Sequence, residues 1–282
     1  MWQVTWRRFC RSRLAVAALL YVGAVTVVAI AAPLIANDHA IVPFAPTATN
    51  LAHRLEGPGA LHRFGTDDLG RDVLSRMIHG ARVSLAVGFT ATLISLVVGS
   101  MLGALAGYYG GAVDWVVSRL IEIVLCFPFL FLVLGIVALF RPSIWTIMIA
   151  LGLTMWTTEA RFIRGEFLRV REMEFAQAAK ASGARDARII FRHLLPNAIA
   201  PVLVSASFGV ASAILTESAL SFLGLGVAVP MASWGSILSI AQRFIDQAWW
   251  LVVFPGVAIF TTVAAFNIIG DRFREALDPT AE

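Results

Sequence analysis

The sequence predicts an all-α protein that crosses a membrane several times. Of its 282 residues, 59% are hydrophobic and only 14% are charged, whereas a soluble globular domain carries about 25% charged residues. Long apolar runs alternate with short polar segments, and none of the polar segments is long enough for an independent catalytic domain. We therefore predict six transmembrane helices in a lipid bilayer. The modest net charge of +4 does not indicate nucleic-acid binding.

The first predicted span follows a short basic stretch that contains Arg7, Arg8 and Arg11. The apolar run from about Leu14 to Ala36 is longer than the apolar part of a signal peptide, which has about 7–15 residues. It is long enough to cross a bilayer, which takes about 20 residues. We interpret it as an uncleaved transmembrane helix with its N-terminus inside the cell. With the start of an outer loop, it makes up a predicted N-terminal segment, residues 1–60.

Residues 61–82 are predicted to form an amphipathic segment at the membrane interface. Thr66 or Asp67 is expected to cap a short helix, on which Asp72 and Arg76 are four residues apart and can pair. A metal site is an alternative interpretation of the same region, although we assign no metal ligand. The residues that suggest a metal site are His62, Asp67, Asp68, Asp72 and His79.

Five further spans form the predicted membrane core, residues 83–270. The second span, from about Val83 to Tyr108, carries a small residue at every fourth position. In lipid, such a stripe lets another helix approach closely, because van der Waals packing drives helix association there. The stripe consists of Ser95, Gly99, Gly103 and Gly107, and the remaining spans are expected at about 113–140, 143–158, 198–216 and 248–269.

Several residues mark the expected ends and bends of these spans. Pro128 is expected to kink the third span, and the fourth is expected to end at Glu159. Trp249 and Trp250 are typical of interface anchors at the start of the sixth span. An outer loop at 227–247 and a polar cytoplasmic tail at 271–282 complete the predicted topology.

The most informative segment is the predicted cytoplasmic loop 161–197. It holds eight basic residues, and the positive-inside rule places such a loop in the cytoplasm; they are Arg161, Arg164, Arg169, Arg171, Lys180, Arg185, Arg188 and Arg192. Residues 174–181 are rich in Ala and lack β-branched side chains, which favours a helix. Gly183 is a plausible helix stop.

A second short helix is expected after that stop, with Asp186 as its N-cap. It would place Ile190 and Leu194 on one face and end near Pro196. The two helices would present a small, Ala-rich surface suited to docking into a groove on a partner protein. An ordinary amphipathic loop is the alternative interpretation.

The sequence contains none of the motifs that would let the chain supply energy or catalysis by itself. GxxxxGK[ST], GxSxG and HExxH are absent, so no ATP site or catalytic residue of these types is predicted. Acids within the spans are few, mainly Glu122 and Glu217, whereas a proton-coupled carrier needs ionisable groups in mid-bilayer. We therefore expect a passive pathway that an energised partner drives.

The pattern QAAKASG followed by HLLPN resembles the EAA loop of ABC importer membrane subunits. In that loop, EAA precedes a Gly by three residues, and I-x-L-P follows nine residues later. The matching positions are Gln177, Ala178, Ala179, Gly183, Leu195 and Pro196. Gln177 replaces the usual Glu, which puts one charge contact with the ATPase in doubt, and His193 replaces the Ile.

His193 is similar to the RHxLPN form found in the dipeptide, oligopeptide and nickel branch of these importers. Three further stretches resemble that branch: FGTDDLGRDVLSR at 64–76, ESALSFLGLG with SWG at 217–235, and GDRFREALDP at 270–279. The extra N-terminal span and long first outer loop are similar to the second, C-type permease subunit. The resemblance covers nearly the whole chain.

The resemblance implies a type I ABC importer permease fold and an assembly of several subunits. Two different permeases would form the pore, two ATPase subunits would bind ATP and Mg²⁺ and drive it, and an external binding protein would deliver the substrate. No cofactor is implied for this chain. The implied ATPase-docking residues are Glu174, Phe175, Gln177, Ala178, Ala179, Gly183, Ala184, Arg185 and Asp186, and the implied loop anchors are His193, Leu195 and Pro196.

Other functions remain as alternatives at this point. The same machinery could import nickel or another small solute rather than dipeptides or oligopeptides. A stand-alone channel or secondary carrier is a more distant alternative. An intramembrane enzyme would require Glu217 or His193 to be catalytic, and neither has an evident partner in the sequence.

Overall fold

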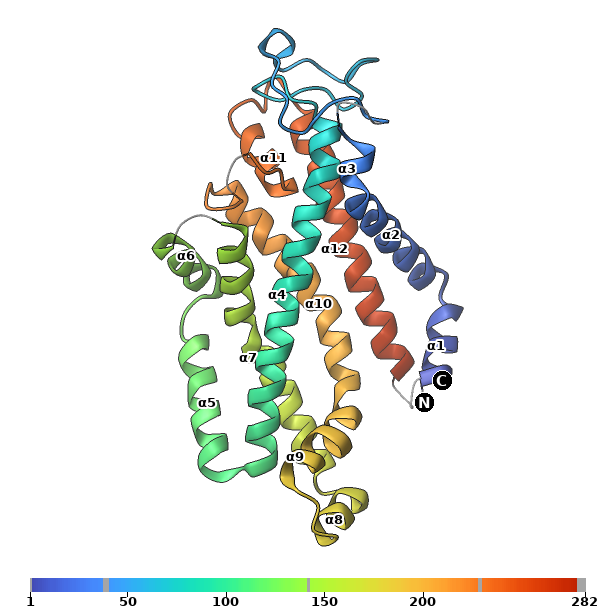
Figure 1. Ribbon diagram of the computed structural model, residues 1–282, viewed down its shortest axis with the longest axis vertical. Coiled ribbons are helices and arrows are strands. Elements are labelled where there is room, and N and C mark those ends of the chain that lie inside the picture. The colour runs from blue at the N-terminus through green and yellow to red at the C-terminus, as the bar shows by residue number, and fades with distance from the viewer. Residues whose placement is uncertain (1, 38–40, 141–142, 228–229, 278–282) are drawn as a thin grey trace.

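The computed structural model describes residues 2–37, 41–140, 143–227 and 230–277. Within these residues the chain forms an elongated bundle of long helices (Figure 1). The long helices are α2 (Arg13–Ile30), α4 (Val73–Tyr109), α7 (Ile144–Val170), α10 (Leu195–Phe222) and α12 (Trp250–Leu277). The shorter ones are α1 (Trp2–Arg11), α3 (Ala32–Ile35), the 3-10 helix η1 (Leu51–His53), α5 (Gly111–Leu125), α6 (Phe129–Leu139), α8 (Glu174–Ala181), α9 (Asp186–Arg188), the π-helix η2 (Ile189–Leu194) and α11 (Trp234–Ala241).

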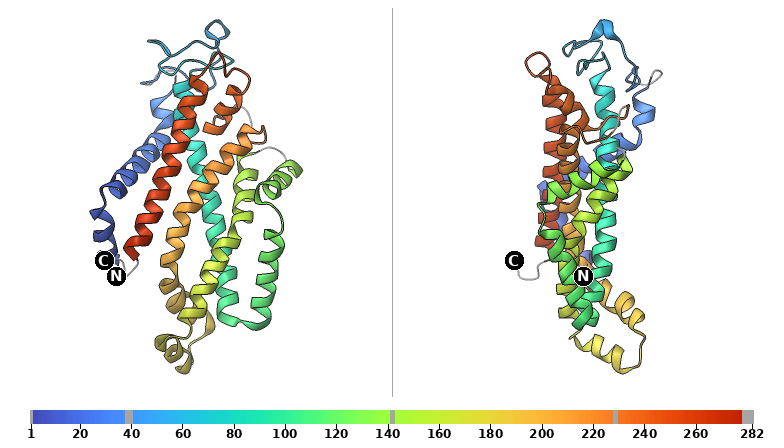
Figure 2. Two further views of the ribbon diagram at one scale, coloured as in Figure 1. Left: turned by 180° about the vertical axis from the view of Figure 1, so that it is seen from behind. Right: turned by 90° about the vertical axis from the view of Figure 1, so that its left-hand side faces the viewer.

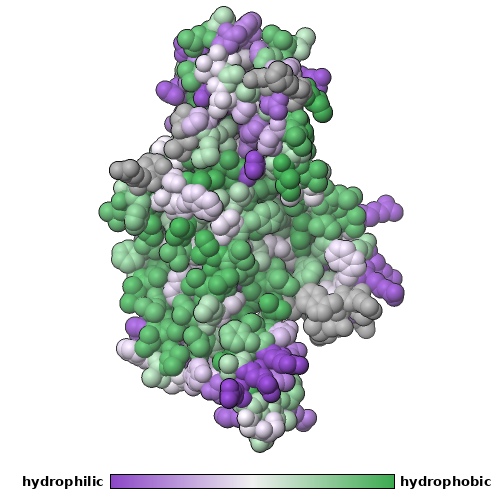
Figure 3. All heavy atoms as spheres, viewed as in Figure 1, coloured by the Kyte–Doolittle hydropathy of each residue, from purple (hydrophilic) through white to green (hydrophobic). Residues whose placement is uncertain are grey.

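The surface of the bundle is divided along its long axis. On the face seen in Figure 3, a broad apolar band crosses the middle, and hydrophilic side chains gather toward the two ends. By length and composition, four helical segments can cross a membrane: α2, α4, α10 from Pro201 onward, and α12; α5 and α6 would together make a fifth. The expected count of six includes α7, whose second half is charged, and it stays a prediction.

The predicted third span is not a kinked helix but two separate ones. The axes of α5 and α6 differ by 86°, and Pro128 stands at the N-cap of α6. Proline lacks the N–H that would continue a helix and clashes with the preceding turn, so the chain breaks completely at this point. On α5, Arg119 and Glu122 lie three residues apart and form an ion pair at 2.5 Å.

The predicted interfacial helix and the predicted second span form one continuous helix, α4, which begins later than the cap expected at Thr66 or Asp67. It starts at Val73 and continues without a break through the second span, and its N-cap is Asp72, which accepts a hydrogen bond from Ser75 N at 2.8 Å. Neither Thr66 nor Asp67 is the cap. Asp67 instead accepts hydrogen bonds from backbone N–H groups of its own turn, a local arrangement that competes with helix formation.

The pairing expected between Asp72 and Arg76 is also wrong. The side chain of Asp72 bonds to His62 at 2.9 Å, and Arg76 lies 3.3 Å from Asp67. Both acids are buried in the folded outer loop, so tertiary contacts determine their partners.

The small-residue stripe of α4 packs against α7, as predicted from its spacing. A Cβ added at Gly103 would lie 2.4 Å from the carbonyl oxygen of Ala160, and one at Gly107 would lie 2.6 Å from the Cβ of Phe167. No side chain fits there, so the two backbones touch along several turns. This contact packs α7 closely along α4.

The remaining long helices enclose the same core. Helices α2 and α12 lie side by side along one edge of the bundle, and α5 and α6 lie along the opposite edge (Figures 1 and 2). Helix α10 runs between α4, α7 and α12. The fourth predicted span does not end at Glu159, because α7 continues to Val170. Likewise α12 continues through the start of the predicted polar tail to Leu277.

Two tryptophans fasten the outer loops to the bundle. The predicted loop 227–247 contains a short helix, α11, with a capping box formed by Ser233 and Ser236. Trp234 donates from its indole N–H to the carbonyl of Met77 at 3.1 Å. Trp250 is buried and donates to the carbonyl of Thr66 at 3.0 Å, so it is a core residue rather than the predicted interface anchor; Trp249 is exposed.

Candidate functional site

A projection stands out at one end of the bundle, beyond the apolar band (Figures 1 and 3). It consists of α8, α9 and η2, residues 174–194. Helix α8 follows α7 after a short turn, and the side-chain amide of Gln177 donates back to the carbonyl of Glu172 at 3.1 Å. Helix α8 ends just before Gly183, whose backbone φ angle is +75°. Only glycine takes this left-handed conformation without steric cost, and the Gly183 stop agrees with the sequence prediction.

Most of the sequence-predicted docking residues lie on the outer surface of this projection. Glu174, Phe175, Gln177 and Ala178 of α8 are exposed, as are Gly183, Arg185 and Asp186 in the turn that follows, whereas Ala179 and Ala184 are half-buried. The outer surface of the projection therefore combines the small residues Ala178 and Gly183 with longer polar, charged and aromatic side chains.

The inner side of the projection is fixed to the bundle by apolar packing. Ile190 and Leu194 are buried, as their four-residue spacing predicts, and Arg188 and Arg192 are exposed on the other side. Fully burying one such aliphatic side chain stabilises a fold by about 1.5–3 kcal/mol. They belong to a cluster that also includes Phe167, Val170, Ala176, Ile189 and Ala198.

Three polar contacts complete the base of the projection. The hydroxyl of Tyr108 donates to Asp186 at 2.7 Å, and Arg171 donates to the carbonyl of Gly107 at 3.0 Å. Arg164 of α7 forms an ion pair with Asp114 of α5. Asp186 is therefore not the N-cap predicted from the sequence: it lies inside the first turn of α9 and ties that turn to the end of α4.

The predicted end of the second short helix at Pro196 is wrong. The chain passes from α9 through the π-helix η2 directly into α10, and Pro196 lies in the first turn of α10. A π-turn relieves the clash that proline would cause in a regular α-helix, and the side chain of Asn197 donates to the carbonyl of His193 at 2.7 Å. The projection is thus joined rigidly to α10.

The predicted loop anchors are buried to different degrees. His193 and Leu195 are half-buried, and Pro196 is exposed. Leu194, with no exposed surface, is the stronger anchor. The residue was absent from the resemblance-based set, although its spacing from Ile190 indicated an inward position.

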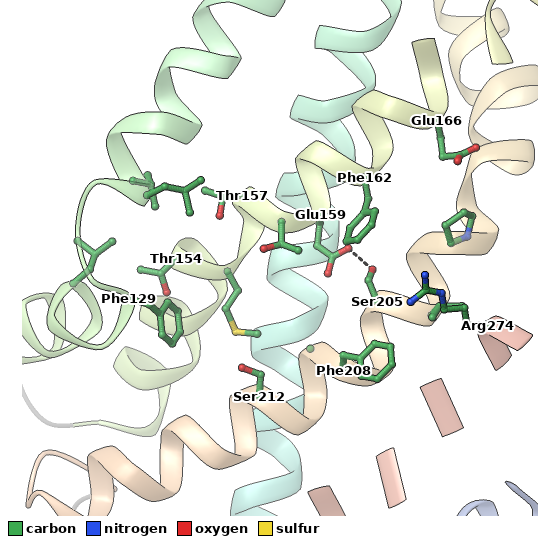
Figure 4. A pocket seen from close by; sticks show the side chains of 18 of the residues that line it. Phe129, Thr154, Thr157, Glu159, Phe162, Glu166, Ser205, Phe208, Ser212 and Arg274 are labelled. Carbon is green, nitrogen blue, oxygen red and sulfur yellow. Dashed lines mark hydrogen bonds between the residues drawn. The ribbon is translucent and has the colours of Figure 1, made fainter. Parts of the chain in front are cut away.

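A cavity of about 860 Å³ lies in the bundle between α5, α6, α7, α10 and the end of α12. Its walls are largely apolar, and a few polar groups point into it, among them Thr154, Thr157, Ser212 and Arg274 (Figure 4). Glu159 is almost completely buried and accepts a hydrogen bond of 2.5 Å from Ser205. The cavity combines apolar bulk with several hydrogen-bonding groups, which suits the passage of a polar solute.

Sequence reasoning missed this cavity and treated Glu159 as the end of a span. A signal was present, because apolar residues recur at helical spacing beyond Glu159, at Ile163 and Phe167, which indicates that the helix continues.

A second buried polar network lies toward the other end of the bundle. Glu217 of α10 has no exposed surface. It accepts hydrogen bonds from Ser84 of α4 at 3.2 Å and from Ser221 at 2.7 Å. Its carboxyl group thus connects α10 with α4. His193, the other residue considered as catalytic, lies in η2 at the base of the projection, and Glu217 lies in α10.

A helical bundle with an apolar surface band, a largely apolar cavity that holds a few polar groups, and a projection at one end is the architecture of a membrane-spanning transporter subunit. Residues 99–282 match the family model described as binding-protein-dependent transport system inner membrane component, and residues 1–58 match that of the N-terminal transmembrane domain of oligopeptide transport permease C. The chain belongs to the binding-protein-dependent transport system inner membrane component family, and it is a multi-pass membrane permease subunit rather than a soluble enzyme.

Several curated proteins are similar to this chain over almost its full length. The dipeptide transport system permease protein DppC of Alkalihalophilus pseudofirmus is 43% identical over 278 residues, which cover 99% of this chain and 90% of that protein. The oligopeptide transport system permease protein OppC of Haemophilus influenzae is 40% identical, with 99% and 88% covered. The glutathione transport system permease protein GsiD of Pectobacterium atrosepticum is 37% identical, with 99% and 91% covered.

Solved structures support the fold. A chain of the MetNI methionine ABC transporter in an inward-facing conformation superposes with a TM-score of 0.56 at 19% identity, covering 71% of this chain and 96% of that one. At this identity the likeness concerns the fold alone, which is that of a type I ABC importer permease.

Proposed function

We propose that this chain is a permease subunit of an ATP-driven importer for dipeptides or oligopeptides. It would form half of the translocation pathway with a second, different permease, receive substrate from an extracytoplasmic binding protein, and be driven by two ATPase subunits that bind ATP and Mg²⁺. The names of its relatives, which refer to dipeptides, oligopeptides and glutathione, support a short peptide as cargo.

The orientation follows from where the basic residues lie. Helix α1, the end of α12 and the projection lie toward the same end of the molecule (Figure 1). That end carries Arg7 and Arg8 together with the arginines of the 161–197 loop. The positive-inside rule therefore supports a cytoplasmic position for both termini and for the projection.

The projection is proposed to be the coupling helix that docks into a groove on an ATPase subunit. The observation that carries this role is the exposed outer face of α8, which includes Ala178 and Glu174 and is supported on a buried base that continues into both α7 and α10. A pull on α8 would reach α7 and α10, two of the helices that line the cavity. Gln177 is engaged with the carbonyl of Glu172, so the exposed carboxylates of Glu172 and Glu174 are the proposed substitutes for the Glu missing at position 177.

The decisive experiment measures ATP-driven uptake by the reconstituted importer. Ala178→Asp places a charge on the proposed docking face, and Ala112→Asp is the matched control, because Ala112 is exposed outside the projection. We expect Ala178→Asp to abolish uptake while the permease pair still assembles, and Ala112→Asp to transport normally. Normal uptake by Ala178→Asp would contradict the docking role.

The cargo is tested separately, in a strain that lacks the permease. Uptake of a labelled dipeptide, a labelled oligopeptide and radioactive nickel would be compared before and after the gene is restored. We expect restored uptake of a peptide. Restored uptake of nickel alone would favour the metal-importing alternative.

A further inference from the structure

The outer loop, at the end of the molecule opposite α8 (Figure 1), brings three potential metal ligands together. His53, Glu56 and His62 each offer one ligand atom, and these atoms lie within 4.8 Å of one another. Two imidazoles and one carboxylate are a donor set that zinc favours when one coordination position stays open. We propose that these three side chains bind a divalent transition-metal ion. The proposal is independent of the transported cargo.

The imidazole of His62 is oriented by a carboxylate, as is usual for a metal ligand. Its side chain is only 6% exposed, and its Nδ1 lies 2.9 Å from Oδ2 of Asp72. A carboxylate that accepts the proton of one ring nitrogen leaves the lone pair of the other nitrogen free for a metal ion, and metal-binding histidines usually have such a partner. Asp72 is itself anchored as the N-cap of α4.

The backbone that carries the other two ligands is also fixed. The hydroxyl of Thr66 donates to the carbonyl of His53 and accepts from the N–H of Glu56, and the N–H of Thr66 donates to the carbonyl of Glu56. Thr66 is completely buried and lies four residues from His62. Thr66 therefore fixes the backbone of His53 and of Glu56 close to His62.

The side chains can reach metal-binding distances by small movements. Nδ1 of His53 lies 2.8 Å from Oε1 of Glu56, and two ligands on a tetrahedral zinc ion are about 3.3 Å apart, given bond lengths of about 2.0–2.1 Å. The widest separation, 4.8 Å, must shrink by roughly 1.5 Å. The side chains of His53 and Glu56 are 37% and 46% exposed, so both can rotate.

This cluster differs from the metal site considered from the sequence. Of that set, Asp67 is paired with Arg71 at 2.7 Å, and His79 is bonded to the carbonyl of Ser75 at 3.2 Å. Only His62 is shared, with Asp72 as the group that orients it. His53 and Glu56 enter because the fold of the loop brings them to His62.

The test is zinc binding by the purified full-length chain in detergent, followed by calorimetry. We expect one Zn²⁺ per chain for the wild type, and binding weakened at least about tenfold in His53→Ala and in Glu56→Gln. His79→Ala is the matched control, because His79 lies nearby on α4 and outside the cluster, and it should bind Zn²⁺ like the wild type. His62 is left intact because it is buried, and a substitution there would disturb the folding of the loop as well as the metal site.

X-ray absorption at the zinc edge gives an independent readout on the wild type. We expect a first shell of nitrogen and oxygen that includes two imidazoles, at about 2.0–2.1 Å. The proposal is overturned if the wild type binds no stoichiometric Zn²⁺, if the His53 and Glu56 variants bind it as tightly as the wild type, or if the spectrum contains no imidazole ligand.

Discussion

Ser84 of α4 donates a hydrogen bond of 3.2 Å to Glu217 of α10, and neither side chain has any exposed surface. The oxygen of Ser84 also accepts from the backbone N–H of Trp234 at 3.3 Å. Three elements that are distant in sequence, α4, α10 and α11, therefore meet at one buried carboxyl group. A buried polar group of this kind stabilises a fold only while every partner is present.

Replacing Glu217 by Ala is expected to destabilise the protein strongly. Each buried hydroxyl left without its partner costs about 1–3 kcal/mol, and two hydroxyls, those of Ser84 and Ser221, depend on this acid. Glu217→Gln keeps an acceptor oxygen and the shape of the side chain, so it should lose much less. The thermal unfolding midpoint of the purified protein is the measurement.

Thr216→Ala is the control for this pair, because Thr216 is adjacent, half-buried and bonded to the carbonyl of Ser212 within its own helix. Its midpoint should remain close to that of the wild type. Equal stability of Glu217→Ala and the wild type would mean that the network is not structural. Normal assembly of Glu217→Gln with lost uptake would instead indicate a direct role in transport.

Gly103→Ala is expected to disturb the contact between α4 and α7. The new Cβ would lie 2.4 Å from a backbone oxygen of α7, so the helices must separate, and overpacking of this kind costs about 1–3 kcal/mol. Gly23→Ala is the control, since a Cβ there meets nothing within 4 Å. We expect a lower unfolding midpoint for Gly103→Ala alone, and equal midpoints would contradict the close packing.

Gly183→Ala should weaken coupling more than it weakens the bundle. A Cβ at Gly183 meets no atom within 4 Å, but φ is +75, and an L-residue in that conformation costs about 1–2 kcal/mol. The end of α8 should therefore shift or fray. Uptake per ATP hydrolysed, measured in proteoliposomes, is expected to fall.

Gly165→Ala provides the matched comparison for Gly183. Gly165 also has open space around its Cβ position, but it lies within α7, where Ala is favoured over Gly by about 1 kcal/mol. This variant should couple normally. A normal uptake ratio in Gly183→Ala would mean that the α8 stop has no part in coupling.

Tyr108→Phe removes the hydrogen bond to Asp186 and leaves the ring in place. We expect a loss of about 1 kcal/mol at the base of the projection, seen as faster amide hydrogen exchange in residues 184–190. The neighbouring variant Tyr109→Phe is the control, because Tyr109 is half-exposed and stacks edge-on against Tyr108. Exchange rates that are equal in the two variants would contradict the anchoring role of Tyr108.

Local patterns predicted those parts of the structure that local physics controls. The four-residue stripe around Gly103 predicted the α4–α7 contact, because only small residues permit it. Ala-rich composition and Gly183 predicted α8 and its end, and the spacing of Ile190 and Leu194 predicted the buried side of the projection. The docking role of the exposed face stays a prediction.

The parts that were missed depend on contacts between distant segments. Asp72 caps α4 because His62 and the folded loop hold it, and nothing nearby in the sequence excluded Thr66 as the cap. Pro196 was expected to end a helix, yet a π-turn accommodates it. Glu159 was expected at a membrane surface, and only the continuation of α7 and the approach of Ser205 place it inside a cavity.

The continuity of α7 makes it a rigid lever. It is 27 residues long, or about 40 Å at 1.5 Å per residue. One end leads through the turn at 171–173 into α8, and its middle forms a wall of the cavity. Tilting a rod of that length by about 10° displaces its far end by about 7 Å. If the projection is pulled as proposed, we expect a movement transmitted through the turn at 171–173 to be amplified over the length of α7.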